Sequence, residues 1–368
     1  MKLYLDVKMI FNINKMTVLA VLALLLHALP AVACTSMLVS AAASASGRPL
    51  LWKHRDTGAP GNFLARVDAD PLSGRDYGFV GLFNNGDSLL TEAWMGMNDA
   101  GLALMNTASY NLAPDTTEYK DREGLIMAHA LGRCRTVDDF AAMLDLLPKP
   151  MGVQANFGVV DADGNGAYFE TDDYGYTRYD LADSPSGVLV RTNFSISGND
   201  TDGAGYLRYE TVERNLPRRR DGMCLVSPEF LTDGLSCSFD HPLLGSPVDK
   251  NLEWAVDQDF IPRPISTASI VIECVNPGQE PSDIRMWAKL GYPPCSHVER
   301  VTLREIPEGL SPSSVWNSTV CEQAMELCRE VHPLRKGNGP RYINIRRLIP
   351  ILESCRALSR QTYHSFEP

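Results

Sequence analysis

The chain has 368 residues, of which 44% are hydrophobic and 21% charged, with 28 glycines and 24 prolines. This composition excludes a disordered or low-complexity protein, and the length allows one large domain or two ordinary ones. The net charge of −11 excludes a surface built for nucleic acid, which needs clustered Lys and Arg; the one dense basic run, 218–220, is interpreted as a solvated turn.

The N-terminal segment has the features of a secretory signal peptide. Three lysines precede the apolar stretch 18–29. The segment ends with Ala31, Val32 and Ala33, and Ala31 and Ala33 are small residues at the two positions that a signal peptidase recognises. The apolar stretch is too short to cross a bilayer, which takes ~20 residues. We therefore expect residues 1–33 to be removed and the product to be exported, either periplasmic or secreted, without a stable membrane anchor.

Nine cysteines in an exported protein leave at least one unpaired. Cys34 directly follows the predicted cleavage site, so it becomes the first residue of the mature chain. The other eight can form up to four disulfides, whose connectivity the sequence does not fix. Because the chain has no CxxC pair and its histidines are scattered, we expect no metal site. The eight are Cys134, Cys224, Cys237, Cys274, Cys295, Cys321, Cys328 and Cys355.

A free N-terminal cysteine combines a nucleophile with its own base. The ordinary pKa values of an α-amine and a thiol lie within about one unit, so moving the thiol proton to the amine costs only ~1 kcal/mol. The chemistry that this implies for Cys34 is acyl transfer through a thioester. Two other interpretations remain open: Cys34 is part of a disulfide, or its thiol carries a lipid. A bacterial lipidation signal prefers Leu at the position of Ala31.

The segment after Cys34 predicts two strands, at 34–39 and 49–56, joined by a turn of small residues at 41–47. A mature chain that begins Cys-Thr and carries an acidic motif about twenty residues later resembles the cysteine N-terminal-nucleophile hydrolases. These include choloylglycine hydrolases, penicillin V acylases and relatives of isopenicillin acyltransferase. The resemblance covers roughly residues 34–300.

The acidic motif supplies two of the site residues that the resemblance implies. The family has Arg-Asn-x-Asp or Gln-Asn-x-Asp where this chain has Lys53, His54, Arg55 and Asp56. The family's Asp hydrogen-bonds the nucleophile and its amine, which implies this role for Asp56. The first residue of the motif helps to hold the thiolate, a role that Lys53 can fill as a point charge.

Three further motifs follow in the family's order. Residues 96–103, GMNDAGLA, resemble a family turn between two strands, in which we expect Asn98 to be a turn residue that tolerates the left-handed region. Asn106, on the following strand, lies where the family supplies a donor to the oxyanion. Asn193 ends a strand and would donate its amide hydrogen to the oxyanion. Arg208, at the start of a helix, corresponds to the family's active-site Arg.

The remaining pattern predicts an α+β protein. We expect helices at 123–133 and 137–147, a hairpin over 156–170, strands at 266–274 and 284–288, and helices at 317–331 and 342–358. The acidic hairpin turn at 161–166 lacks the last ligand of a calcium loop and is interpreted as a turn. With the resemblance, this order implies the four-layer αββα sandwich of the superfamily. We expect a signal peptide (1–33), a hydrolase domain (34–310) and a helical C-terminal extension (311–368).

The resemblance implies an exported hydrolase of linear, non-peptide amide bonds that acts through Cys34 without a cofactor. Its partners would be small-molecule amides such as N-acyl amino acids, bile salts or penicillins. An acyltransferase would use the same residues and is the first alternative. A catalytically inactive, lipid-anchored binding protein is the second, because Lys53 and His54 depart from the family's motif. A dipeptidase of the same superfamily is the third.

The intact mass and N-terminal sequence of the exported protein test the first step of this argument. We expect a chain that starts at an unmodified Cys34 and gains one iodoacetamide adduct there. A start elsewhere, a disulfide at Cys34 or the added mass of a diacylglycerol would remove the nucleophile and favour a binding protein.

Overall fold

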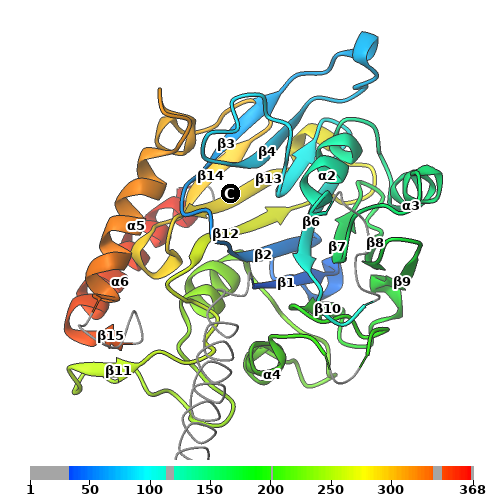
Figure 1. Cartoon of the computed structure of the whole chain (residues 1–368). Helices are drawn as coiled ribbons and strands as arrows, with labels where there is room; N and C mark the ends of the chain where they lie inside the picture. Colours follow the sequence, from blue (N-terminus) through cyan, green and yellow to red (C-terminus); the bar gives the residue numbers. More distant parts are fainter. Residues whose placement is uncertain (1–32, 113–119, 200–201, 335–341, 366–368) are drawn as a thin grey trace, which may run out of the picture. The chain divides into compact units, whose positions relative to one another are not determined.

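The structure is a computed structural model that describes residues 33–112, 120–199, 202–334 and 342–365 (Figure 1). Residues 33–368 form one compact unit, which holds both the expected hydrolase domain and the expected C-terminal extension. Apart from Ala33, the expected signal peptide lies outside the described residues.

The first sheet of the described chain has six strands, and Cys34 begins the second strand from one edge. β1 begins at Cys34 and pairs antiparallel with β2 on one side and with β10 on the other. Every residue of β1 and β2 is buried, which confirms the two strands expected at the start of the mature chain. In sheet order the strands are β10 (Val188–Arg191), β1 (Cys34–Val39), β2 (Leu50–Asp56), β12 (Ser266–Glu273), β13 (Arg285–Leu290) and β14 (Glu299–Thr302).

The second sheet is an antiparallel meander of seven strands in chain order. Its β5–β6 turn corrects one expectation: Asn98 ends β5, and Gly101, with φ 82°, takes the left-handed conformation instead. The Asn98 side chain closes the turn, because its Oδ1 accepts hydrogen bonds from the N–H groups of Ala100 and Leu102. The strands are β3 (Asn62–Val67), β4 (Phe79–Asn84), β5 (Met95–Asn98), β6 (Ala103–Ala108), β7 (Ala155–Val160), β8 (Gly166–Thr171) and β9 (Tyr176–Asp180).

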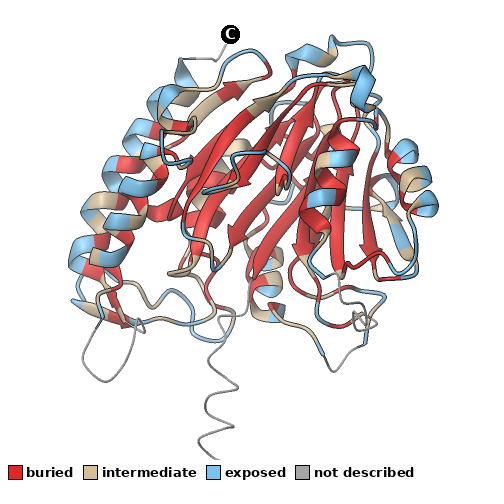
Figure 2. Cartoon of the chain, turned by 45° about the horizontal axis from the view of Figure 1, so that its top comes forward, coloured by how far each residue is buried: buried red, intermediate tan, exposed pale blue. Residues whose placement is uncertain are grey.

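The two sheets face each other across an apolar core. Leu38 and Leu51 of the first sheet share one cluster of buried side chains with Leu64 and Met105 of the second. Burying each such side chain stabilises the fold by roughly 1.5–3 kcal/mol, so this core holds the sheets together. Figure 2 shows buried strands flanked by helices whose outer faces are exposed. The expected mixed fold with antiparallel sheets is therefore confirmed.

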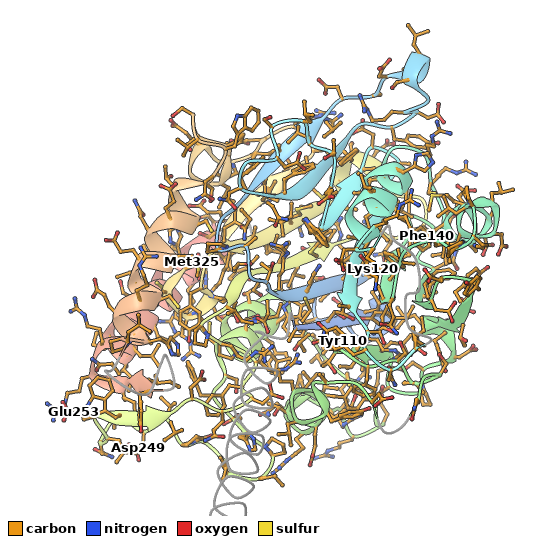
Figure 3. All side chains as sticks on the ribbon, in the orientation of Figure 1. Tyr110, Lys120, Phe140, Asp249, Glu253 and Met325 are labelled. Carbon is orange, nitrogen blue, oxygen red and sulfur yellow. The ribbon has the colours of Figure 1, made fainter. Side chains whose placement is uncertain are left out.

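Helices cover the sheets. α2 (Glu123–Leu131) and α3 (Val137–Leu146) pack on the meander, where Phe140 meets Phe157 and Phe169 edge to face at 5.6 and 5.2 Å between ring centroids (Figure 3). α4 (Tyr206–Asn215) packs beside β10. Within the described residues, no helix combines the length and the hydropathy that a membrane span requires.

The C-terminal helices are part of the same unit. α5 (Thr319–Val331) and α6 (Ile345–His364) share an apolar cluster with Phe260 and Tyr292. The helix expected from residue 342 is preceded by a short strand, β15 (Tyr342–Asn344), because these residues pair with β11 (Trp254–Val256). The Asn344 side chain then accepts from the N–H of Arg347 and caps the helix.

All nine cysteines are buried free thiols in the structure. The pairing that export suggested is therefore absent from the structure. Several of these side chains occupy different apolar clusters, whereas Cys237, Cys295 and Cys328 share one. Cys134 lies under α2 and α3, Cys224 lies in the cluster on the outer face of the six-stranded sheet, and Cys274 lies between the sheets. Cysteine in such places behaves as a small hydrophobic side chain.

Replacing Phe140 by Ala tests the core between α3 and the meander. Because Phe140 is 0% exposed, Phe140→Ala should lower the free energy of unfolding by about 3–5 kcal/mol in urea denaturation. Leu146→Ala on the same helix is the control: this side chain is 85% exposed, and its loss should change the value by less than about 0.5 kcal/mol. Equal midpoints for the two variants would contradict this packing.

Candidate active site

Cys34 is held at the end of a strand that is paired on both sides. Its backbone N–H donates to Asn193 Oδ1 at 2.8 Å, and its Sγ lies 3.8 Å from the carbonyl oxygen of Asp56. Only 5% of the residue is exposed. In the described chain this nitrogen is an amide bonded to Ala33, and the hydrogen bond to Asn193 fixes its position.

Asn193 fixes the nitrogen of Cys34. It follows β10, and its Oδ1 accepts a second hydrogen bond, from Arg208 Nη2 at 2.9 Å. Its Nδ2 donates to Ala108 O at 2.8 Å, so the donation to an oxyanion expected from the sequence would use the second hydrogen of that amide. Tyr110, labelled in Figure 3, donates its backbone N–H to Asn193 O at 3.3 Å.

Arg208 lies against the nucleophile and is buried, with 1% exposed. From the first turn of α4, its Nη1 donates to Cys34 O at 2.6 Å and to Thr35 Oγ1 at 3.0 Å. Its Nε donates to Asp259 Oδ1 at 3.2 Å. The structure therefore brings Arg208 to Cys34, where the resemblance implies it, instead of leaving it solvated as an arginine in a helix's first turn ordinarily is.

The Asp56 carboxylate is a charge-paired group at the end of β2. The hydrogen bond from this carboxylate to Cys34 that the resemblance implies is not among the contacts of the described residues, because the side chain projects to the other face of the strand and only the Asp56 carbonyl oxygen lies near Cys34 Sγ. Arg263 Nη2 donates to one carboxylate oxygen at 2.7 Å, and Ser266 Oγ donates to the other at 2.6 Å. Burial opposes ionisation, but Arg263 and the hydrogen bond from His54 together lower the pKa of Asp56 to about 2. Asp56 is therefore an anion at any pH near neutrality.

His54 supports Asp56 from the same face of β2. Its Nε2 lies 2.8 Å from Ser266 Oγ and 3.4 Å from Asp56 Oδ1. Because Ser266 Oγ donates its only hydrogen to Asp56 and also accepts from the N–H of Arg263, it must accept from His54 Nε2. The histidine that replaces the family's Asn thus acts as a donor that steadies the carboxylate's serine partner.

Lys53 and Asn106 form a buried pair on the opposite face of β2. Lys53 Nζ donates to Asn106 Oδ1 at 2.7 Å and to Trp94 O at 2.8 Å. Burial lowers the pKa of Lys53 to about 7. The neighbouring Cys34 acts in the opposite direction, because negative charge on its thiol raises the pKa of the amine, but this effect is smaller. The structure therefore brings Asn106 to the nucleophile's side of the sheet, with its carboxamide oxygen already bound.

Sequence reasoning missed Arg263, Asp259 and Ser266. Arg263 Nη1 donates to Asp259 Oδ1 at 3.2 Å, which joins the partners of Asp56 to those of Arg208. Arg263 and Asp259 lie in a loop before β12, and no motif marks them. Within the described ranges, no group of three or more His, Cys, Asp or Glu side chains is arranged to hold a metal ion.

The chain resembles three solved hydrolase structures distantly. A Caenorhabditis elegans N-acylethanolamine-hydrolyzing acid amidase ortholog is 16% identical, over 65% of this chain and 92% of that one, with a TM-score of 0.39. A mutant conjugated bile acid hydrolase from Clostridium perfringens is 11% identical, over 74% and 92%, with a TM-score of 0.39. Penicillin V acylase from Agrobacterium tumefaciens is 13% identical, over 76% and 88%, with a TM-score of 0.38. No protein-family model and no curated protein matches.

The depressed pKa of Lys53 makes the stability of the fold depend on pH. Between about pH 7 and 10.5 the unfolded chain keeps a proton on Lys53 that the folded chain has released, so stability rises with pH across this window. Lys53→Met removes this contribution. Its stability advantage over the wild type should be largest below pH 7 and shrink by up to about 5 kcal/mol by pH 10.5.

Urea denaturation of both proteins at pH 6, 8 and 10 measures this difference. Lys250→Met, which removes an exposed lysine, is the control and should follow the wild type at every pH. A Lys53→Met curve parallel to that of the wild type would show that Lys53 keeps an ordinary pKa.

Proposed function

We propose that this chain is an exported hydrolase of linear amides, and that Cys34, freed as the N-terminal residue, is its nucleophile. The supporting observation is the double anchoring of Cys34, whose N–H is bound to Asn193 Oδ1 and whose carbonyl oxygen is bound to Arg208. Because β10 pairs with β1 only from Ser36 onward, these two side chains fix the backbone of Cys34 at the strand end and so fix the nitrogen that would act as the base. The small-molecule amide is the substrate class that this chemistry fits.

The reaction begins with proton transfer from the thiol to the α-amine. The thiolate then attacks the amide carbonyl carbon and forms the carbon–sulfur bond, and the negative charge moves to the carbonyl oxygen. When the intermediate collapses, the carbon–nitrogen bond breaks and the ammonium of Cys34 returns its proton to the departing amine, leaving a thioester. Water, deprotonated by the same amine, attacks the thioester and releases the acid and the thiol.

The surrounding residues hold the reacting groups in place. Asn193 fixes the orientation of the Cys34 nitrogen, and the Asp56 backbone carbonyl oxygen lies 3.8 Å from the Cys34 thiol. Asn193 is the candidate donor to the oxyanion, because its Nδ2 has a second hydrogen that Ala108 O does not accept. Loss of such a contact costs about 3 kcal/mol in other enzymes. Lys53 lies on the face of the sheet that carries the thiol and, with a pKa of about 7, supplies positive charge there only when it is protonated.

An acyltransferase would share these residues and differ in one step. The thioester would pass its acyl group to an amine instead of water, so the two activities are distinguished by adding a competing amine to the assay. Release of the free acid in its presence supports the hydrolase.

Replacement of the nucleophile tests the proposal directly. Cys34→Ala and Cys34→Ser should lower the release of amine from N-acyl amides by about 10³-fold or more, because no thioester forms. Circular dichroism and the urea midpoint should show an intact fold. The panel should contain N-acyl glycines, N-acyl ethanolamines and phenoxyacetyl amides, with the amine product measured.

Cys355→Ala is the matched control, because it removes a buried thiol outside the site and should leave turnover unchanged. If the wild type carries a free, alkylatable Cys34 and hydrolyses no amide of the panel, or if Cys34→Ala remains active, the proposed function is wrong.

A further inference from the structure

Arg55 lies directly beside the nucleophile, on the same face of the sheet. The antiparallel register of β1 and β2 places Cys34 opposite Arg55, and side chains of directly opposed residues project to the same side about 4.5–5.5 Å apart at Cβ. This face looks toward the meander, because Leu38 and Leu51, each four residues away along the same strands, lie in the core between the sheets. Only 3% of Arg55 is exposed.

Arg55 is a buried cation with no carboxylate partner among the described residues. Its Nη2 donates to Asn84 Oδ1 at 2.7 Å, its guanidinium lies 5.2 Å from the ring centre of Trp94, and its Nη1 has no hydrogen-bond partner. Burying a charge without a compensating partner costs several kcal/mol. This cost makes a lone buried guanidinium an unusual feature of a folded core.

Other buried arginines of the described chain are paired with acids. Arg191 donates to Glu170 at 2.6 Å, and Arg263 donates to Asp56 at 2.7 Å. Arg208 donates to Asp259 at 3.2 Å. Arg55 therefore stands apart in a protein that otherwise neutralises its buried guanidinium groups.

Further unpartnered polar atoms gather around Arg55. Trp94, whose ring lies beside the guanidinium, has no partner for its indole Nε1–H. Asn62, which pairs across β3 and β4 with Asn84, the partner of Arg55 Nη2, has an unpartnered Oδ1. Two of these atoms, Arg55 Nη1 and Trp94 Nε1, can only donate, so together they require an acceptor.

We propose that Arg55, assisted by the indole N–H of Trp94, binds a carboxylate that the substrate carries close to the scissile amide. This inference rests on the proposed function and names its substrate class: amides with an acid group within a few bonds of the carbonyl. A carboxylate accepts from a guanidinium in a charge-assisted hydrogen bond and supplies the negative charge that the described residues do not.

Two kinds of amide carry a carboxylate in this place. In an N-acyl amino acid it belongs to the departing amine, and in a monoamide of a short dicarboxylic acid it belongs to the acyl half. Matched substrates distinguish them: N-octanoylglycine, its neutral counterpart N-octanoylethanolamine, and the N-octyl monoamide of succinic acid. Each is assayed with the wild type, Arg55→Met, Arg55→Lys and the exposed-site control Arg219→Met.

Arg55→Met should lower kcat/KM for the carboxylate substrate by about 10- to 100-fold, mostly through KM, and change the value for N-octanoylethanolamine by less than about threefold. For the carboxylate substrate, kcat/KM of Arg55→Lys should lie between those of the wild type and Arg55→Met, because lysine keeps the positive charge but lacks the two parallel N–H donors of the guanidinium. Arg219→Met should match the wild type. If Arg55→Met lowers kcat/KM for N-octanoylglycine, Arg55 binds a carboxylate on the departing amine. If it lowers kcat/KM for the succinic monoamide, Arg55 binds a carboxylate on the acyl half.

An equal loss for charged and neutral substrates, with slower alkylation of Cys34 by iodoacetamide, would show that Arg55 acts on the thiol and would overturn the proposal. Calorimetry keeps the inference separate from the proposed function. If the wild type hydrolyses nothing, Arg55-dependent binding of N-octanoylglycine, but not of N-octanoylethanolamine, to the folded Cys34→Ala protein would still support the carboxylate site. Equal binding of the two by Cys34→Ala and by Cys34→Ala/Arg55→Met would exclude it.

Discussion

The guanidinium of Arg208 is the contact on which the geometry of the site depends. From one planar group it binds the carbonyl oxygen of Cys34, the hydroxyl of Thr35, the carboxamide oxygen of Asn193 and the carboxylate of Asp259. These partners come from a strand, a strand end and a loop far apart in the chain. A single buried fork of donors thus sets the distance between the nucleophile's backbone and the asparagine that holds its nitrogen.

The alternation of β2 divides the charges of the site between two faces. His54 and Asp56 project to one side, where Arg263 neutralises the carboxylate, while Lys53 and Arg55 project to the other, between the sheets. A short charged motif at a strand end would ordinarily be solvated. Here both faces of the strand are covered, so the same residues become a buried anion with its partner on one side and, on the other, a guanidinium beside an amine whose pKa burial has lowered to about 7.

Much of this arrangement was predictable, because it is encoded locally. The two strands at the start of the mature chain follow from their composition, and the resemblance that Cys34, Asp56 and Asn193 carry implied the mixed fold that the structure confirms. The placement of Arg208 and Asn106 near the nucleophile also agrees with that resemblance, while their catalytic roles stay predictions.

The remainder depends on contacts that no local pattern encodes. Arg263 reaches Asp56 from a position 207 residues away, through a loop without a motif, so only the packed chain identifies it as the carboxylate's partner. The turn at Asn98 shows the same limit on a smaller scale: the tolerance of Asn for left-handed backbone suggested one conformation, and Gly101, which meets no steric cost there, adopted it instead.

The pairing of β1 on both sides has a consequence for the chain end that cleavage would create. A new N-terminus ordinarily frays, and fixing the backbone of each frayed residue costs about 1–2 kcal/mol of conformational entropy. Cys34 begins a strand whose neighbours on both sides, together with Asn193 and Arg208, already hold it while the peptide bond to Ala33 is intact. Its terminal amine would therefore be released into a fixed position. The conformational entropy of ordering this residue is already lost when the whole sheet folds, so cleavage adds no further ordering step.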